Sequence, residues 1–132
     1  MKTATLTSGK SFNQLIPDDI KTIIFNHETK SKHIQKYVDV SNKQDESIIA
    51  WKKGESFIVS TQDDDVTIMA NKDSSGMFYW KREIKEIVFD NFDTSKVTKM
   101  YSMFNDCHNL TTLDLSNFNT SKVTDMSFMF SM

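Results

Sequence analysis

The chain has 132 residues, of which 38% are hydrophobic and 26% are charged, a balance typical of one soluble domain with a buried core. Its formal net charge of −2 gives no electrostatic reason to bind nucleic acid, which usually requires a clustered basic face. No apolar run approaches the roughly 18 residues of a membrane helix, so we expect no membrane insertion.

Residues 1–72 are predicted to form a β-rich capping region. Residues 1–16 are polar and lead into a turn signal at Pro17. The next apolar residues are spaced I-x-x-I-x-F over 20–25, a spacing that recurs at 84–89. Two interpretations stay open: a degenerate first strand docked on the repeat sheet, or a coincidence within a short pattern.

The second half of this region has the pattern of a β-hairpin. Residues 47–51 and 56–60 are rich in β-branched and aromatic residues and flank a short loop that contains Gly54. Three aspartates then turn the chain into a further strand at 66–70. We expect this region to cover the apolar face and the strand edge of the first repeat.

Residues 73–132 carry a 26-residue repeat. The segments 87–106 and 113–132 are identical at ten of twenty aligned positions, and a Met-Phe pair recurs at 77, 103 and 129. A period of this length is typical of a supersecondary unit that stacks on copies of itself, as in a solenoid. We therefore expect two units and a truncated third, joined to the capping region by one continuous core.

Each unit shows two periodicities. Residues 110–118 are spaced L-x-x-L-x-L-x-x-F, close to the leucine-rich-repeat consensus, and contain a strand. Val123, Met126 and Phe130 then fall at i, i+3 and i+7, which predicts a helix with its N-cap at residue 120 or 121. The predicted fold class is α+β: a β-rich cap followed by a short leucine-rich-repeat solenoid, with a strand and a short helix in each unit.

The block Thr-Ser-Lys-Val-Thr occurs at 94–98 and again at 120–124. In the structural interpretation, these residues form and cap a turn, and the block is repeated because each unit contains the same turn. Its functional interpretation is a column of ligand-facing side chains, Lys96, Thr98, Lys122 and Thr124, since exposed repeat positions are where solenoids bind.

Cys107 and His108 suggest a nucleophile or a metal site, but adjacent residues rarely face each other and zinc requires three or four ligands. Asp63, Asp64 and Asp65 lack the spacing of a calcium loop. We expect no catalytic, cofactor or metal site and no enzymatic activity.

Four large aromatic residues are candidates for a carbohydrate platform: Trp51, Tyr79, Trp80 and Tyr101. Residues of this kind are more often partial core than carbohydrate platforms, and a surface cluster of them would favour sugar binding.

The segments FDTSKVTKMYSMFNDC and LDLSNFNTSKVTDMSFMF resemble the repeats of BspA-like leucine-rich-repeat surface proteins of bacteria. Residues 11–25 and 33–78 are similar to the region that precedes the first repeat in many members. The resemblance implies the N-terminal portion of a secreted or wall-displayed protein, here with about two repeats and without the export signal or anchor of longer members. It implies host or neighbouring-cell surface proteins as partners and supplies no catalytic residues.

The predicted function is a non-enzymatic protein–protein interaction or adhesion module, located outside the cell or on its surface in the parent protein. The alternatives are a purely structural capping region without its own ligand, and a carbohydrate-binding module with exposed, coplanar Trp or Tyr rings. The truncated last unit should leave Val123, Met126, Phe128 and Phe130 poorly covered, which predicts fraying of its helix or self-association through this uncapped repeat.

Overall fold

The computed structural model describes residues 2–131, which form β-strands and turns with one short helix. In chain order the elements are β1 (Lys2–Thr5), α1 (Gly9–Leu15), β2 (Thr22–Asn26), β3 (Val38–Asp39), β4 (Ile49–Lys53), β5 (Ser56–Ser60), β6 (Val66–Met69), β7 (Glu86–Phe89) and β8 (Thr112–Leu113). No helix within residues 2–131 is long and apolar enough to cross a membrane.

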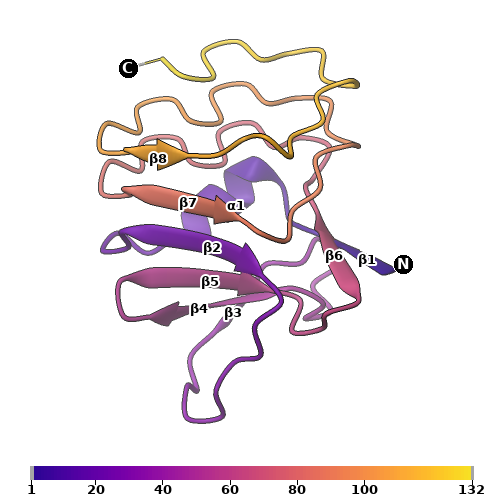
Figure 1. The fold of residues 1–132 in the computed structure, drawn as a ribbon, viewed down its shortest axis with the longest axis vertical. Helices are drawn as coiled ribbons and strands as arrows, with labels where there is room; N and C mark the ends of the chain where they lie inside the picture. Colours follow the sequence, from indigo (N-terminus) through magenta and orange to yellow (C-terminus); the bar gives the residue numbers. More distant parts are fainter. Residues whose placement is uncertain (1, 132) are drawn as a thin grey trace.

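Six strands form the main sheet in the order β3-β4-β5-β2-β7-β8, and β1 pairs with β6 in a separate two-stranded sheet (Figure 1). Strands β5, β2, β7 and β8 run parallel to one another. In β2, Ile23 pairs with Ile87 and Phe25 with Phe89. The early I-x-x-I-x-F pattern is therefore a strand docked on the repeat sheet and not a coincidence.

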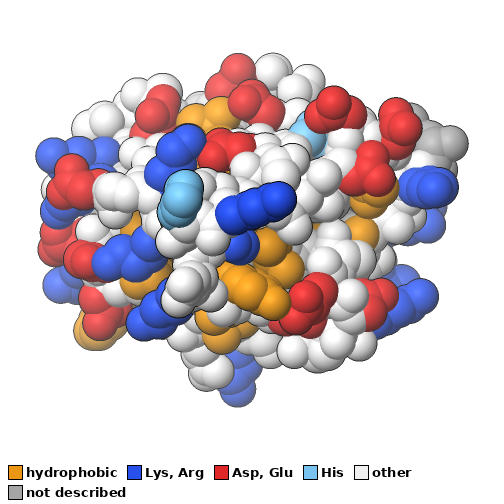
Figure 2. All heavy atoms as spheres, turned by 90° about the horizontal axis from the view of Figure 1, so that it is seen from below, with side chains coloured by type: hydrophobic (Ala, Val, Ile, Leu, Met, Phe, Trp, Pro, Cys, Tyr) orange, Lys and Arg blue, Asp and Glu red, His pale blue; other side chains and the backbone are white. Residues whose placement is uncertain are grey.

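The expected hairpin is present as β4 and β5, which pair antiparallel around Gly54 at a φ of 62°. It lies at the end of the stack opposite the last repeat (Figure 1). Seen from this end, Lys, Arg, Asp and Glu side chains are interspersed, with hydrophobic side chains visible only in small areas between them (Figure 2). A charged end of this kind discourages edge-to-edge association of sheets.

The prediction of an α+β solenoid with a helix in every unit is wrong. Within residues 2–131 the single helix, α1, lies before the repeats. Residues 97–104 and 123–130 instead pass through an isolated bridge, at Lys99 and at Asp125, and then enter turns that begin at residues 101 and 127. Residues at or next to 94 and 120 therefore cap no helix. Instead the Thr94 hydroxyl donates to the carbonyl oxygen of Asn119 at 3.1 Å and accepts from its N–H at 2.8 Å, which ties two units together.

Left-handed backbone explains why no helix forms in the units. Gly76, Ser102 and Phe128 occupy equivalent positions and have φ values of 68°, 56° and 57°. Trp80 and Asp106 form a second such set, with φ values of 63° and 66°. Two left-handed residues in each of the first two units turn the chain before an i→i−4 ladder can form, and only glycine adopts this region without a steric cost.

The core is a column of aromatic rings that crosses the units. Phe25 in β2 lies 5.3 Å from Phe89 in β7, and Phe78 stacks on Phe104 at 5.4 Å. Helix α1 covers one face of the sheet through Phe12, whose ring lies 5.8 Å from that of Phe25. One cluster of buried residues runs from Ala4 to Met129 and includes the expected Met-Phe pairs, except for Phe130, which is exposed.

Candidate functional site

The predicted column of Lys96, Thr98, Lys122 and Thr124 lies along the outside of the stacked turns. Both lysines are exposed. The Thr98 hydroxyl donates to the carbonyl oxygen of Lys72 at 3.3 Å, and the Thr124 hydroxyl donates to that of Thr98 at 3.2 Å. The threonine hydroxyls thus join one unit to the next. Of the column, the two lysines remain as exposed side chains.

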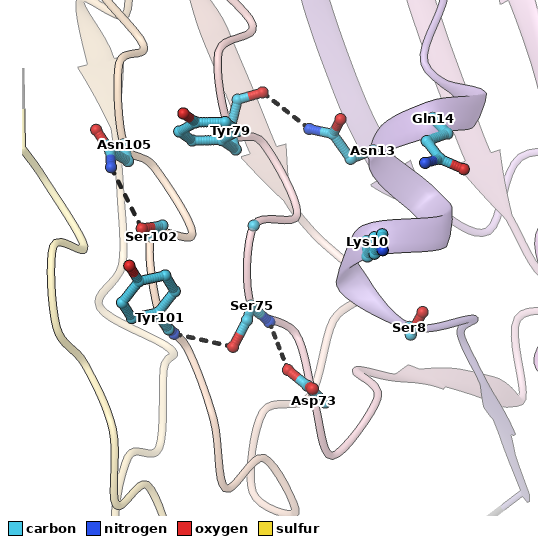
Figure 3. A pocket seen from close by; sticks show the side chains of 11 residues that line it. Ser8, Lys10, Asn13, Gln14, Asp73, Ser75, Tyr79, Tyr101, Ser102 and Asn105 are labelled. Carbon is cyan, nitrogen blue, oxygen red and sulfur yellow. Dashed lines mark hydrogen bonds between the residues drawn. The ribbon is translucent and has the colours of Figure 1, made fainter.

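A second surface feature is a groove between α1 and the turns of the first two units, which we call the α1 groove (Figure 3). Its volume is about 540 Å³. It is lined by Ser8, Lys10, Asn13, Gln14, Asp73, Ser75, Gly76, Tyr79, Tyr101, Ser102 and Asn105.

Helix α1 forms one wall of the α1 groove and is fixed at both ends. The Ser8 hydroxyl caps its start by accepting from the N–H of Ser11 at 3.3 Å. The Gly9 N–H donates to the carbonyl oxygen of Asp73 at 2.9 Å, and the Asn13 side-chain amide donates to that of Tyr79 at 2.9 Å. These bonds hold the wall rigidly against the first repeat.

The opposite wall consists of turns braced by short side chains. The Asp73 carboxylate accepts from the N–H of Ser75 at 3.1 Å, and the Ser75 hydroxyl accepts from the N–H of Tyr101 at 3.1 Å. The Asn105 amide donates to the Ser102 hydroxyl at 3.2 Å. Figure 3 shows these bonds, of which the one between Ser75 and Tyr101 joins neighbouring units, and the two tyrosine rings on successive turns.

The α1 groove offers uncommitted polar groups beside aromatic rings. Tyr79 is 44% exposed and Tyr101 is 45% exposed. Within residues 2–131, their hydroxyls, the Lys10 ammonium and the Gln14 amide have no hydrogen-bond partner. This arrangement is suited to holding a polar ligand by hydrogen bonds and ring contacts.

Of the four large aromatic residues considered as partial core or as a carbohydrate platform, Trp51 is buried, whereas Tyr79, Trp80 and Tyr101 are exposed. Trp80 is 57% exposed, and its ring stacks beside that of Tyr79 with centroids 6.3 Å apart and planes 19° apart. The Arg82 guanidinium lies 4.7 Å from the Trp80 ring centroid. These rings form a surface cluster next to the α1 groove.

The groove residues of α1 were missed because no helix was expected before residue 17. A signal was present: Ser8 stands four residues before Phe12, and Phe12 stands four before Ile16, as an N-cap and one apolar face require. Both apolar side chains are buried in the structure.

Cys107 is buried, and its thiol donates to the carbonyl oxygen of Phe78 at 3.0 Å. Burial raises the pKa of the Cys107 thiol from its ordinary value of 9.0 to about 11, so the thiolate is scarce at neutral pH. The neighbouring His108 faces away toward Asp106, with its Nε2 atom 2.6 Å from the carboxylate. The pair therefore does not assemble a nucleophile with its base.

This burial predicts slow alkylation of Cys107. In the folded chain at pH 7.5, iodoacetamide should react with Cys107 about 100-fold more slowly than after unfolding in guanidinium. The folded thiol is rarely ionised, and the reagent cannot reach the buried sulfur. Since the folded thiol ionises near pH 11 and the unfolded thiol near 9.0, the free energy of unfolding should fall as the pH rises through this interval. Equal rates in folded and unfolded protein at pH 7.5 would contradict the buried position.

Acidic and sulfur-bearing side chains do not gather elsewhere into a site. No group of three or more His, Cys, Asp and Glu side chains in residues 2–131 is placed to hold a metal ion. Asp63 forms a turn instead, with its carboxylate accepting from the N–H of Asp65 at 2.9 Å.

Comparison with curated proteins and with solved structures gave no match. A family described as "Mycoplasma protein of unknown function, DUF285" matches residues 50–132, which include most of β4, all of β5 and all of the repeat units. The chain therefore belongs to the DUF285 family.

Proposed function

We propose that the chain is a non-enzymatic binding module that holds an exposed segment of a partner protein in the α1 groove. The observation that carries this proposal is the pair of half-exposed tyrosines, Tyr79 and Tyr101, on successive turns of a groove with a braced wall on each side. Tyrosine is enriched in protein interfaces because it combines a large rigid apolar ring with a hydrogen-bonding hydroxyl.

The polarity of the α1 groove supports a peptide-like ligand. Asn105, Gln14 and Ser102 present amide and hydroxyl groups of the kind that pair with backbone N–H and C=O groups. Lys10 and Asp73 contribute one charge of each sign. A groove with little net charge selects its ligand by shape and hydrogen bonds rather than by electrostatic attraction.

The repeat pattern supports a proposal for where the parent protein acts. The resemblance to BspA-like surface proteins leads us to propose that the parent protein acts outside the cell or on its surface. Its partners would then be surface proteins of a host or of neighbouring cells. The stacked units carry the α1 groove as a rigid scaffold, and a pre-formed site loses less entropy on binding.

Binding to immobilised extracellular-matrix and cell-surface proteins, followed by surface plasmon resonance, tests this function. We expect at least one protein to bind. The double variant Y79A/Y101A should weaken that binding by about 30-fold, because tyrosines that become covered in an interface are frequent hot spots. The matched control K96A/K122A changes two exposed residues of the predicted column and should bind like the parent. An equal loss in both variants, or no binder for the unmodified chain, would contradict the proposal.

A carbohydrate ligand is the second candidate, supported by the nearly parallel rings of Tyr79 and Trp80 on the surface. Such rings stack on the apolar faces of sugars. A glycan array distinguishes the two functions. Glycans that bind the unmodified chain but not the W80A variant favour sugar binding, whereas an array on which no glycan binds excludes the carbohydrate candidate. An unmodified chain that binds neither proteins nor glycans leaves the purely structural capping role.

A further inference from the structure

A second, smaller core lies on the face of the main sheet opposite to α1. Ile49 and Trp51 in β4 pack there with Ile58 in β5, and the three side chains are 4%, 1% and 2% exposed. Ala50 and Val59 belong to the main core instead, because alternate residues of a strand point to opposite faces. We call Ile49, Trp51 and Ile58 the outer cluster.

The outer cluster is covered by residues 27–37, which connect β2 to β3 and which we call the cover segment. Figure 1 shows this segment as a long loop at the hairpin end of the stack. Two partly buried apolar side chains in residues 2–131 pack against the outer cluster, Ile24 in β2 and Ile34 in the cover segment. Residues 32, 33, 35 and 36 are exposed. The middle of the cover segment thus contributes one apolar side chain, that of Ile34, to this second core.

The cover segment is bonded to the rest of the chain only near its two ends. At its start, the Lys30 N–H donates to the side-chain oxygen of Gln62 at 2.9 Å. At its end, the Tyr37 hydroxyl donates to the Glu46 carboxylate at 3.1 Å. Within residues 2–131, residues 31–36 form hydrogen bonds only inside the segment. A stretch with so few outside contacts opens at a lower free energy than the core of the protein.

Lys30 holds the cover segment in its closed shape. Its ammonium group donates to the carbonyl oxygen of Ser31 at 3.2 Å and to that of Ile34. Its Nζ atom also lies 5.6 Å from the centroid of the Tyr37 ring. Hydrogen bonds from a charged donor are stronger than those between neutral groups. Because one of these carbonyls belongs to Ile34, Lys30 fixes the backbone of the residue that packs on the outer cluster.

The closed position leaves one buried polar group without a partner. Within residues 2–131, the Trp51 indole N–H is buried and has no hydrogen-bond partner. A buried donor of this kind is less favourable than one that bonds to water. Opening of the cover segment lets water reach this N–H. It leaves the main core intact, since no residue of 27–37 belongs to that core.

We propose that the cover segment opens as one unit and exposes the outer cluster while the main sheet stays folded, and that Lys30 keeps it closed. The open state presents three large apolar side chains and a free indole N–H on a face of the sheet that the α1 groove does not use. The Lys30 ammonium group controls access to this surface. The device is independent of the function proposed for the α1 groove.

Hydrogen exchange of the Trp51 indole N–H, followed by NMR, tests the opening. Local opening exposes little surface, so about 1 M urea should change this exchange rate by less than about 2-fold. The backbone N–H groups of β2, between β5 and β7, should exchange about 10-fold faster in the same urea, because they are released by unfolding. The indole N–H of Trp80, which is exposed, serves as a fast internal reference.

Two substitutions test the role of the closed segment. K30Q removes the ammonium group and should speed exchange of the Trp51 indole N–H by about 10-fold. I34A removes the apolar contact and should speed it by about 10-fold as well. Lys32→Gln is the matched control, because Lys32 is exposed and has no hydrogen-bond partner in residues 2–131. The K32Q variant should exchange like the unmodified chain.

Two results would overturn the proposal. One is a Trp51 indole N–H whose exchange rises with urea as steeply as that of the β2 amides, since the outer cluster would then be exposed only by unfolding. The other is equal exchange in K30Q and K32Q, which would show that the Lys30 ammonium group does not keep the cover segment closed.

Discussion

Replacing Phe25 with alanine is expected to lower the free energy of unfolding by about 4 kcal/mol. The Phe25 side chain is fully buried, and its ring lies within 4.8–6.2 Å of four other rings: those of Phe12, Phe78, Phe89 and Phe92. Its removal leaves a cavity where α1, β2, β7 and the first repeat turn meet. Urea unfolding followed by tryptophan fluorescence measures the loss.

Phe130→Ala is the matched control, because this phenylalanine is exposed and keeps only one stacked neighbour. It should cost less than about 1 kcal/mol. Phe25→Leu retains most of the side-chain volume and should lower the free energy of unfolding by about 1–2 kcal/mol. This milder variant can be compared with F130A if F25A does not fold. Equal costs for F25A and F130A would contradict the placement of Phe25 at the centre of the core.

Replacing Gly9 with alanine is expected to destabilise the chain by about 2–3 kcal/mol, although alanine is the better helix former by about 1 kcal/mol. A Cβ atom at position 9 would lie 2.4 Å from the carbonyl oxygen of Ser75 and 2.6 Å from that of Ser74. These are backbone atoms of a hydrogen-bonded turn and cannot move aside alone. The substitution should push α1 off the first repeat and weaken the ligand binding proposed for the α1 groove.

Gln14→Ala is the control for this change, because Gln14 lies on the exposed side of the same helix and has no hydrogen-bond partner in residues 2–131. Thermal unfolding should leave Q14A within about 0.5 kcal/mol of the parent. A stabilised G9A variant would show that helix propensity outweighs contact with the repeat, and that α1 is not seated as described.

The stacking of the repeats was readable from the sequence because it depends on one period. The offset of 26 residues predicts the register in which Phe78, Phe104 and Phe130 align. The strand at 22–26 was also visible, since its apolar spacing repeats that of β7. Both features require only local pattern and identity between copies.

The path of the chain within a unit was not readable. Val97, Met100 and Phe104 follow helical spacing and are buried, as a helix would have them. Successive turns of three or four residues produce the same spacing. A helix and a series of turns differ in where their backbone N–H groups are directed. In a helix the Met100 N–H would donate to a carbonyl four residues earlier, but here it donates to the carbonyl of a residue 25 positions later. The spacing of apolar residues within one unit cannot predict a hydrogen bond to the next unit.

The α1 groove lay beyond sequence reasoning for a related reason. Its walls come from residues far apart in the chain, as the bond between Asn13 and Tyr79 across 66 residues shows. Helix α1 has only seven residues and depends on its contacts with the first repeat. The predicted column at Lys96 and Lys122, by contrast, lies within the repeat block and was visible from identity alone.

Scalar couplings across hydrogen bonds, measured by NMR on the isotope-labelled chain, test the central claim most directly. A stack of strand-and-turn units predicts couplings from the amide nitrogens of Gly76 and Ser102 to the carbonyl carbons of residues 101 and 127, each 25 residues away. Couplings from residues 100–104 to carbonyl carbons four residues earlier, as in a helix, would contradict it.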